Sequence, residues 1–124
     1  MNKTFDVTPT AALVLIEKGA LLVDVREPHE VAKKSFDVPG VMLIPLREFE
    51  NRYKEIPAER QVIIACNLGN RSLMATRFLI NHGYSKAVNM QRGIVCWENE
   101  GLPIKKAEKE KNGSWLLQQF RGKS

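Results

Sequence analysis

The stretch "VIIACNLGNRSLMATRFLI", residues 62–80, joins a run of β-formers to a helical pattern through a very short loop. Residues 61–65 are mostly apolar and β-branched, which is typical of a strand that is covered on both faces. From Asn70 onward the apolar residues recur at helical spacing until Gly83, a residue type that commonly ends helices. The stretch therefore predicts a strand, a loop and a helix, with Cys66 at the carboxyl end of the strand.

Strand-like and helix-like segments alternate along the rest of the chain. Apolar runs of the same kind lie at 20–27 and 41–46, with a weaker one at 87–91, and helical patterns lie at 9–18, 27–34 and 46–56. The first of these helices has a clear start, because Thr8 can cap it and Pro9 suits its first position. This alternation predicts an α/β domain with a mostly parallel sheet.

Composition places the chain among ordinary globular proteins. It has 124 residues, of which 44% are hydrophobic and 27% charged, so we expect one main domain. No apolar run approaches the ~20 residues that a membrane span needs, and the start of the sequence lacks the apolar core of a signal peptide. We therefore expect a cytoplasmic location. The two cysteines are too few for a disulfide framework and match no zinc-site spacing, so no metal site is expected.

The net charge of +5 is concentrated at the end of the chain, since residues 105–124 carry +4 and the other residues +1. We divide the chain into a domain at 1–104 and a basic C-terminal extension at 105–124, expected to be helical. The basic residues form no stripe with interleaved aromatics, so no nucleic-acid binding is expected. Apolar residues of the extension (Trp115, Leu116 and Phe120) favour docking onto this domain or onto a second copy, as in a homodimer, over contact with a membrane surface or an acidic partner.

Cys66 stands where several features favour an anionic nucleophile. Ligands of open α/β sheets gather at the carboxyl ends of strands, and the N-terminus of the following helix presents free N–H groups. Gly69 allows the loop to curl, and Arg71 adds a positive charge suited to an oxyanion. A cysteine can also end a strand simply as a small buried residue. The combination of strand end, glycine, arginine and helix start favours a reactive thiolate.

Four segments together resemble the rhodanese homology domain in their order and spacing: "VDVREPHE", "PGVMLIPL", "ACNLGNRS" and "GYSKAVNMQRGIVCWENEGLP". The resemblance runs from about Thr8 to Ile104. It implies a rhodanese-like, three-layer α/β/α fold with a five-stranded, mostly parallel sheet. It also implies a catalytic Cys66, a substrate-binding loop of Asn67, Leu68, Gly69, Asn70 and Arg71, and loop support from Asp24, Arg26 and Ser72.

The activity that this resemblance implies is that of a sulfurtransferase of the thiosulfate sulfurtransferase type. The Cys66 thiolate would attack the sulfane sulfur of a small anion such as thiosulfate, or of a persulfide, and become a persulfide itself. A thiol, cyanide or a protein acceptor would then remove that sulfur. No metal or organic cofactor is implied. The chain departs from the family at two places. Asp37 stands where a histidine is common, and the pair Arg92 and Gly93 stands where two consecutive glycines are common.

Two other functions are alternatives to a sulfurtransferase. A cysteine phosphatase uses a similar loop, but with five residues between its cysteine and arginine, whereas four separate Cys66 from Arg71. A non-enzymatic sulfur carrier or protein-binding module of the same fold is the stronger alternative, although retention of Cys66 argues against it.

The second cysteine, Cys96, has two possible roles. It could serve as a resolving thiol for Cys66; a buried thiol packed by Trp97 is the favoured interpretation.

Overall fold

The computed structural model describes residues 5–107. Its main sheet has five strands in the order β1-β6-β5-β2-β4, and every neighbouring pair is parallel. The strands are β1 (Asp6–Val7), β2 (Leu21–Asp24), β4 (Met42–Leu43), β5 (Val62–Ala65) and β6 (Ala87–Met90). The helices are α1 (Pro9–Glu17), α2 (Pro28–Lys33), α3 (Phe49–Arg52), α4 (Asn70–Asn81) and α5 (Gly93–Asn99), with 3-10 turns η1 (Leu46–Glu48) and η2 (Tyr53–Glu55). The predicted fold class is confirmed.

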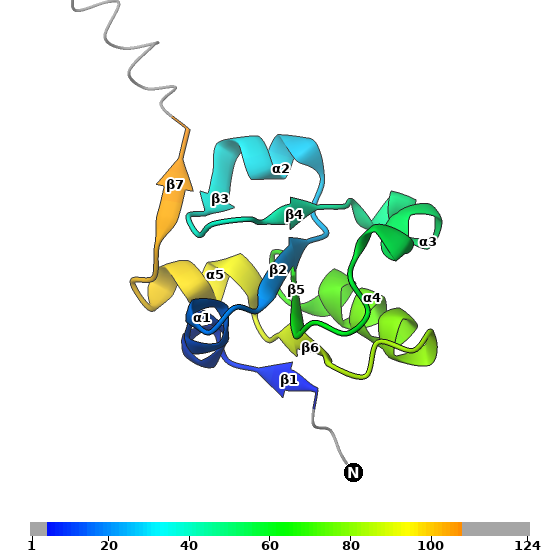
Figure 1. Ribbon diagram of the computed structural model, residues 1–124. Helices are drawn as coiled ribbons and strands as arrows, with labels where there is room; N and C mark the ends of the chain where they lie inside the picture. The colour runs from blue at the N-terminus through cyan, green and yellow to red at the C-terminus, as the bar shows by residue number, and fades with distance from the viewer. Residues whose placement is uncertain (1–4, 108–124) are drawn as a thin grey trace, which may run out of the picture.

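The sheet lies between two helical layers, with α1 and α5 on one side and α3 and α4 on the other (Figure 1). Successive strand residues face opposite layers, so each buried strand contributes to two cores. In β5, Ile63 packs into the core beside α1 and α5, whereas Ile64 packs into the core beside α4, and both are fully buried. This arrangement explains why the strands read as continuous apolar runs in the sequence.

The central strand β5 leads directly into the loop that begins at Cys66. Its neighbour β2 ends beside it, with Asp24 opposite Ala65 in the ladder and the Val25 N–H donating to the Ala65 carbonyl at 3.0 Å. The segment after β2 therefore lies next to the start of the loop. Parallel pairing thus brings the motif at 24–26 to the same edge of the sheet as the cysteine.

The prediction of one continuous helix at 46–56 is wrong, because the chain forms three short elements there, η1, α3 and η2. The Tyr84 hydroxyl donates to the carbonyls of Tyr53, at 3.1 Å, and Ile56, at 2.6 Å, and these long-range bonds hold the last turn. The strand predicted at 41–46 is also shorter than expected. Ile44 and Leu46 still donate to the segment of β2, but Pro45 between them has no N–H to offer.

A second, two-stranded antiparallel sheet joins β3 (Lys34–Phe36) to β7 (Ile104–Lys106). Lys105 pairs with Ser35 and Lys106 with Lys34, so the first two residues of the predicted helical extension are strand, because the ladder to β3 takes up their backbone groups. The remainder of that prediction, including Trp115, Leu116 and Phe120, lies outside the described residues. Within residues 5–107, no helix combines the length and apolar character needed to cross a membrane.

Candidate functional site

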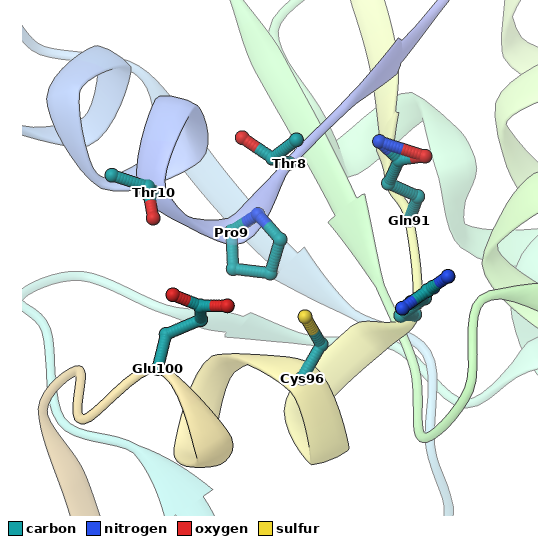
Figure 2. A pocket seen from close by; sticks show the side chains of 7 residues that line it. Thr8, Pro9, Thr10, Gln91, Cys96 and Glu100 are labelled. Carbon is teal, nitrogen blue, oxygen red and sulfur yellow. The ribbon is translucent and has the colours of Figure 1, made fainter.

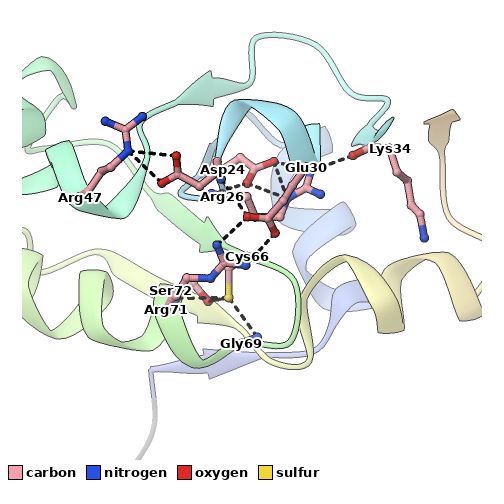
Figure 3. Close-up of polar contacts among 10 residues, drawn as sticks. Asp24, Arg26, Glu30, Lys34, Arg47, Cys66, Gly69, Arg71 and Ser72 are labelled. Carbon is pink, nitrogen blue, oxygen red and sulfur yellow. Dashed lines mark hydrogen bonds and ion pairs between the residues drawn. The ribbon is translucent and has the colours of Figure 1, made fainter. Parts of the chain in front are cut away.

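The Cys66 sulfur lies within hydrogen-bonding distance of polar groups from the loop and from the start of α4 (Figure 3). The backbone N–H of Gly69 points at Sγ from 3.1 Å, and that of Ser72 from 3.3 Å. The Ser72 hydroxyl lies 3.3 Å from the same sulfur. Hydrogen bonds of this kind strengthen when the acceptor carries a negative charge. The loop is therefore arranged to hold an anionic sulfur at this position.

Two glycines allow the loop to curl in this way. Gly69, the residue before α4, has φ of +102°, which L side chains rarely adopt, and a Cβ there would lie 2.9 Å from the Arg92 nitrogen. Gly93, at the start of α5, has φ of +51°, and a Cβ there would overlap the carbonyl oxygens of Cys66 and Asn67. Both positions therefore require glycine for steric reasons as well as for their backbone angles.

The close approach at Gly93 lets α5 hold the loop from behind. The Ile94 N–H donates to the Cys66 carbonyl at 2.9 Å, and the Val95 N–H donates to the Asn67 carbonyl at 3.3 Å. These bonds engage the two carbonyls with α5, whereas N–H groups farther along the chain donate to the sulfur. Sequence reasoning recognised Gly93 only as part of a family difference. The backbone contacts that it permits have no signature in residue spacing.

Arg71 lies at the mouth of the loop and is bound to Glu30 of α2. Its Nη1 and Nη2 each donate to one Glu30 carboxylate oxygen at 2.8 Å, a bidentate ion pair. The hydrogen bonds from Arg71 lower the pKa of Glu30 to about 2, and the same contact raises the pKa of Arg71. Sequence reasoning missed Glu30, which is 41 positions away from Arg71.

Asp24 and Arg26 form a buried ion pair, with Nη2 and Oδ2 2.8 Å apart. Arg26 Nη2 also donates to the Lys34 carbonyl at 2.9 Å, and its guanidinium lies 5.8 Å from the centre of the Phe36 ring. Within residues 5–107 these side chains make no hydrogen bond to the loop at 66–71. They fix the segment that follows β2, which lies beside the loop, so any support they give the loop is indirect.

A cavity of about 250 Å³ opens over the loop. Most of the predicted substrate-binding residues line it, while Gly69 contributes its N–H to the sulfur from below; the lining residues are Cys66, Asn67, Leu68, Asn70 and Arg71. The Leu68 side chain at the mouth is 58% exposed. The cavity has room for a reactant of a few heavy atoms, and Cys66 itself is almost fully buried at its base.

Cys96 lies in a different cavity, of about 240 Å³, between α5 and the start of α1 (Figure 2). Its thiol is half-buried and faces Pro9, so Cys96 is not the buried thiol that the sequence favoured. Trp97 beside it is fully buried, donates its indole N–H to the Pro103 carbonyl and packs edge-on against Phe36. Among residues 5–107, no three His, Cys, Asp or Glu side chains gather in a way that could hold a metal ion.

Known proteins resemble this chain over most of its length. The family model described as Rhodanese-like domain matches residues 8–100. A sulfurtransferase from Allochromatium vinosum is 39% identical over 87 residues, which cover 70% of this chain and 79% of the relative. A thiosulfate sulfurtransferase from Pseudomonas syringae is 29% identical over 91 residues, which cover 73% of this chain and 84% of the relative.

Solved structures agree with the sequence relatives. The crystal structure of a rhodanese-related protein from Thermoplasma volcanium superposes with a TM-score of 0.72 at 28% identity, and covers 82% of this chain and 98% of its own. The resemblance recognised in the sequence is thereby confirmed. The chain belongs to the rhodanese-like domain family.

Proposed function

We propose that this protein is a sulfurtransferase that carries sulfane sulfur on Cys66. It takes that sulfur from thiosulfate or a persulfide and passes it to a thiophilic acceptor such as a thiol, cyanide or a protein. The observation that carries this proposal is the set of three polar groups around the Cys66 sulfur: two backbone N–H groups that donate to it, and the Ser72 hydroxyl within hydrogen-bonding distance. The sulfurtransferase names of similar proteins support the same reaction class.

The reaction has two halves. The Cys66 thiolate attacks the outer sulfur of thiosulfate, a new S–S bond forms, and the old S–S bond breaks as sulfite leaves with its electron pair. The persulfide that remains carries the negative charge on its outer sulfur, over the N–H side of the loop. A nucleophilic acceptor then attacks that outer sulfur and releases the Cys66 thiolate; with cyanide the product is thiocyanate.

The loop residues suit this chemistry because neither half needs a protein acid. Asn67, Leu68, Gly69 and Asn70 carry no titratable side chain, and the leaving groups depart as anions. The covalent persulfide is the carrier, so the proposal requires no resident cofactor. It does require a reduced Cys66, which agrees with the cytoplasmic location expected from the sequence.

The test is the intact mass of the reduced protein after exposure to thiosulfate or to a small-molecule persulfide, with Cys66→Ser as the control. We expect a gain of one sulfur atom in the wild type, its loss on addition of cyanide, and no gain in the control. Failure of both donors to load Cys66 would overturn the proposal. Loading without repeated turnover would indicate a sulfur carrier, and hydrolysis of p-nitrophenyl phosphate would indicate a phosphatase.

A further inference from the structure

The charge of the loop is already neutralised before any substrate arrives. Among residues 66–71, Arg71 alone is charged when the thiol is protonated, and both of its terminal nitrogens are bound to the Glu30 carboxylate. With a pKa of about 2, Glu30 remains ionised throughout the physiological range. The loop and its ion-pair partner therefore acquire a net negative charge when the Cys66 thiolate forms.

Two other cations around α2 are also engaged with carboxylates. Arg26 is paired with Asp24, and Arg47 is paired with Glu27, the residue that precedes α2 (Figure 3). A dianion that approaches this cluster meets ion pairs, because each of these guanidinium groups is bound to a carboxylate. These ion pairs reduce the electrostatic attraction that the three arginines would otherwise exert on a dianion.

The mouth of the loop also exposes an apolar side chain, beside the amides of Asn67 and Asn70. Leu68, which lines the cavity over Cys66, is 58% exposed; Met74, one turn beyond Arg71 on α4, is 62% exposed and lines a separate cavity beside α3. Apolar side chains contribute nothing to the binding of thiosulfate, which is small and fully charged. They do suit the organic portion of a thiol whose sulfur reaches the cavity.

On the basis of the function proposed above, we propose that Glu30 is a specificity-determining residue. By holding the guanidinium of Arg71, it disfavours dianionic thiosulfate and favours the persulfide of an organic thiol, R–S–SH, as the sulfur donor. The Cys66 thiolate attacks the outer sulfur of R–S–SH and forms a new S–S bond, and the old S–S bond breaks with its electron pair leaving on R–S⁻. The products are the Cys66 persulfide and a thiolate, so neither oxidant nor reductant is consumed.

The test compares two donors on the full chain and on Glu30→Gln. Glutamine keeps the size of the side chain and an oxygen that can accept the Glu27 N–H, a bond of 3.1 Å at the start of α2. It removes the negative charge that holds Arg71. We expect kcat/KM for loading Cys66 from thiosulfate to rise about five- to twentyfold, because a freed guanidinium can bind the dianion. Loading from the hydropersulfide of N-acetylcysteine methyl ester, an uncharged thiol, should change less than about twofold.

Two further variants make the result specific. Glu98→Gln removes a carboxylate that pairs with Lys34, the residue after α2, and with Lys106, and it should leave the ratio of the two donors unchanged. Arg71→Gln in the Glu30→Gln background should abolish the gain with thiosulfate. An unchanged donor ratio in Glu30→Gln, with the wild type loading normally, would overturn this inference alone. Failure of the wild type to load from either donor would instead overturn the proposed function.

Discussion

Gly93 lies where α5 meets the loop, and a side chain at this position should disturb both stability and activity. Gly93→Ala should lower the unfolding free energy by about 2 kcal/mol or more, because the new methyl overlaps two loop carbonyls and φ is +51°. Sulfur loading should fall at least tenfold, since the displaced loop no longer points Gly69 N–H at the sulfur. Urea unfolding and intact-mass loading rates measure the two effects.

The matched control for this variant lies just beyond the other end of the same helix. Gly101 has φ of +77° but nothing within 4 Å of an added Cβ. Gly101→Ala should therefore cost about 1 kcal/mol from backbone strain alone and load sulfur at the wild-type rate. Equal loss of loading in both alanine variants would contradict the role given to the contact at Gly93.

Arg92 is the one non-glycine residue with positive φ in the described part of the chain, at +63°. This is also a position where the family commonly has glycine. A left-handed backbone conformation destabilises a residue that has a Cβ by about 1–2 kcal/mol, and glycine removes this strain. Glycine also gives the unfolded chain more conformational freedom, which offsets part of the stabilisation. Arg92→Gly should therefore raise the unfolding free energy by up to about 1 kcal/mol, as measured by urea unfolding. Arg92→Ala keeps the Cβ and should show no gain; a gain of equal size there would trace the effect to the guanidinium.

At the scale of elements, the ion pair between Glu30 of α2 and Arg71 of the loop makes the stability of the protein depend on pH. The pKa of Glu30 is lowered to about 2 in the folded protein from about 4.5, chiefly by its hydrogen bonds with Arg71. Between those two values the unfolded chain binds the proton more readily, so the stability that the pair contributes is present above pH 4.5 and is lost as the pH falls towards 2. Unfolding free energies of wild type and Glu30→Gln should therefore converge over this interval. If the two unfolding free energies instead differed by a constant amount across this interval, the ion pair would not be the source of the pH dependence.

The elements also differ in how well the sequence predicts them. α4 was predictable, because its apolar residues repeat at helical spacing and Gly83 follows its end. The segment at 46–56 was not, because the hydroxyl of Tyr84, far along the chain, binds carbonyls of its last turn. β1 has only two residues and is formed by its pairing with β6, so it leaves no periodic signal.

At the scale of the whole molecule, the sequence predicts the layers better than the contacts between them. Continuous apolar runs predicted a covered parallel sheet, and the strand-loop-helix order placed Cys66 at the correct edge of it. The Glu30–Arg71 pair and the contact of Gly93 with the loop depend on how separate segments meet in space. Neither residue type nor spacing predicts which of these segments come into contact, so the ion pair and the close contact of the candidate site became visible only in the structure.

Because the sheet separates two cores, mutations on its opposite faces should act independently. Ile63→Val and Ile64→Val each remove one buried methyl group, from the α1–α5 side and the α4 side respectively. Valine keeps the β-branch that a strand favours, so each variant should lose about 0.5–1.5 kcal/mol by leaving a small cavity. Although the two residues are adjacent in β5, their side chains share no core, and the double variant should lose the sum within about 0.5 kcal/mol. Urea unfolding of the four proteins measures this coupling directly. A coupling above 1 kcal/mol would mean that the backbone of β5 transmits strain from one core to the other, and hence to Cys66 at its end.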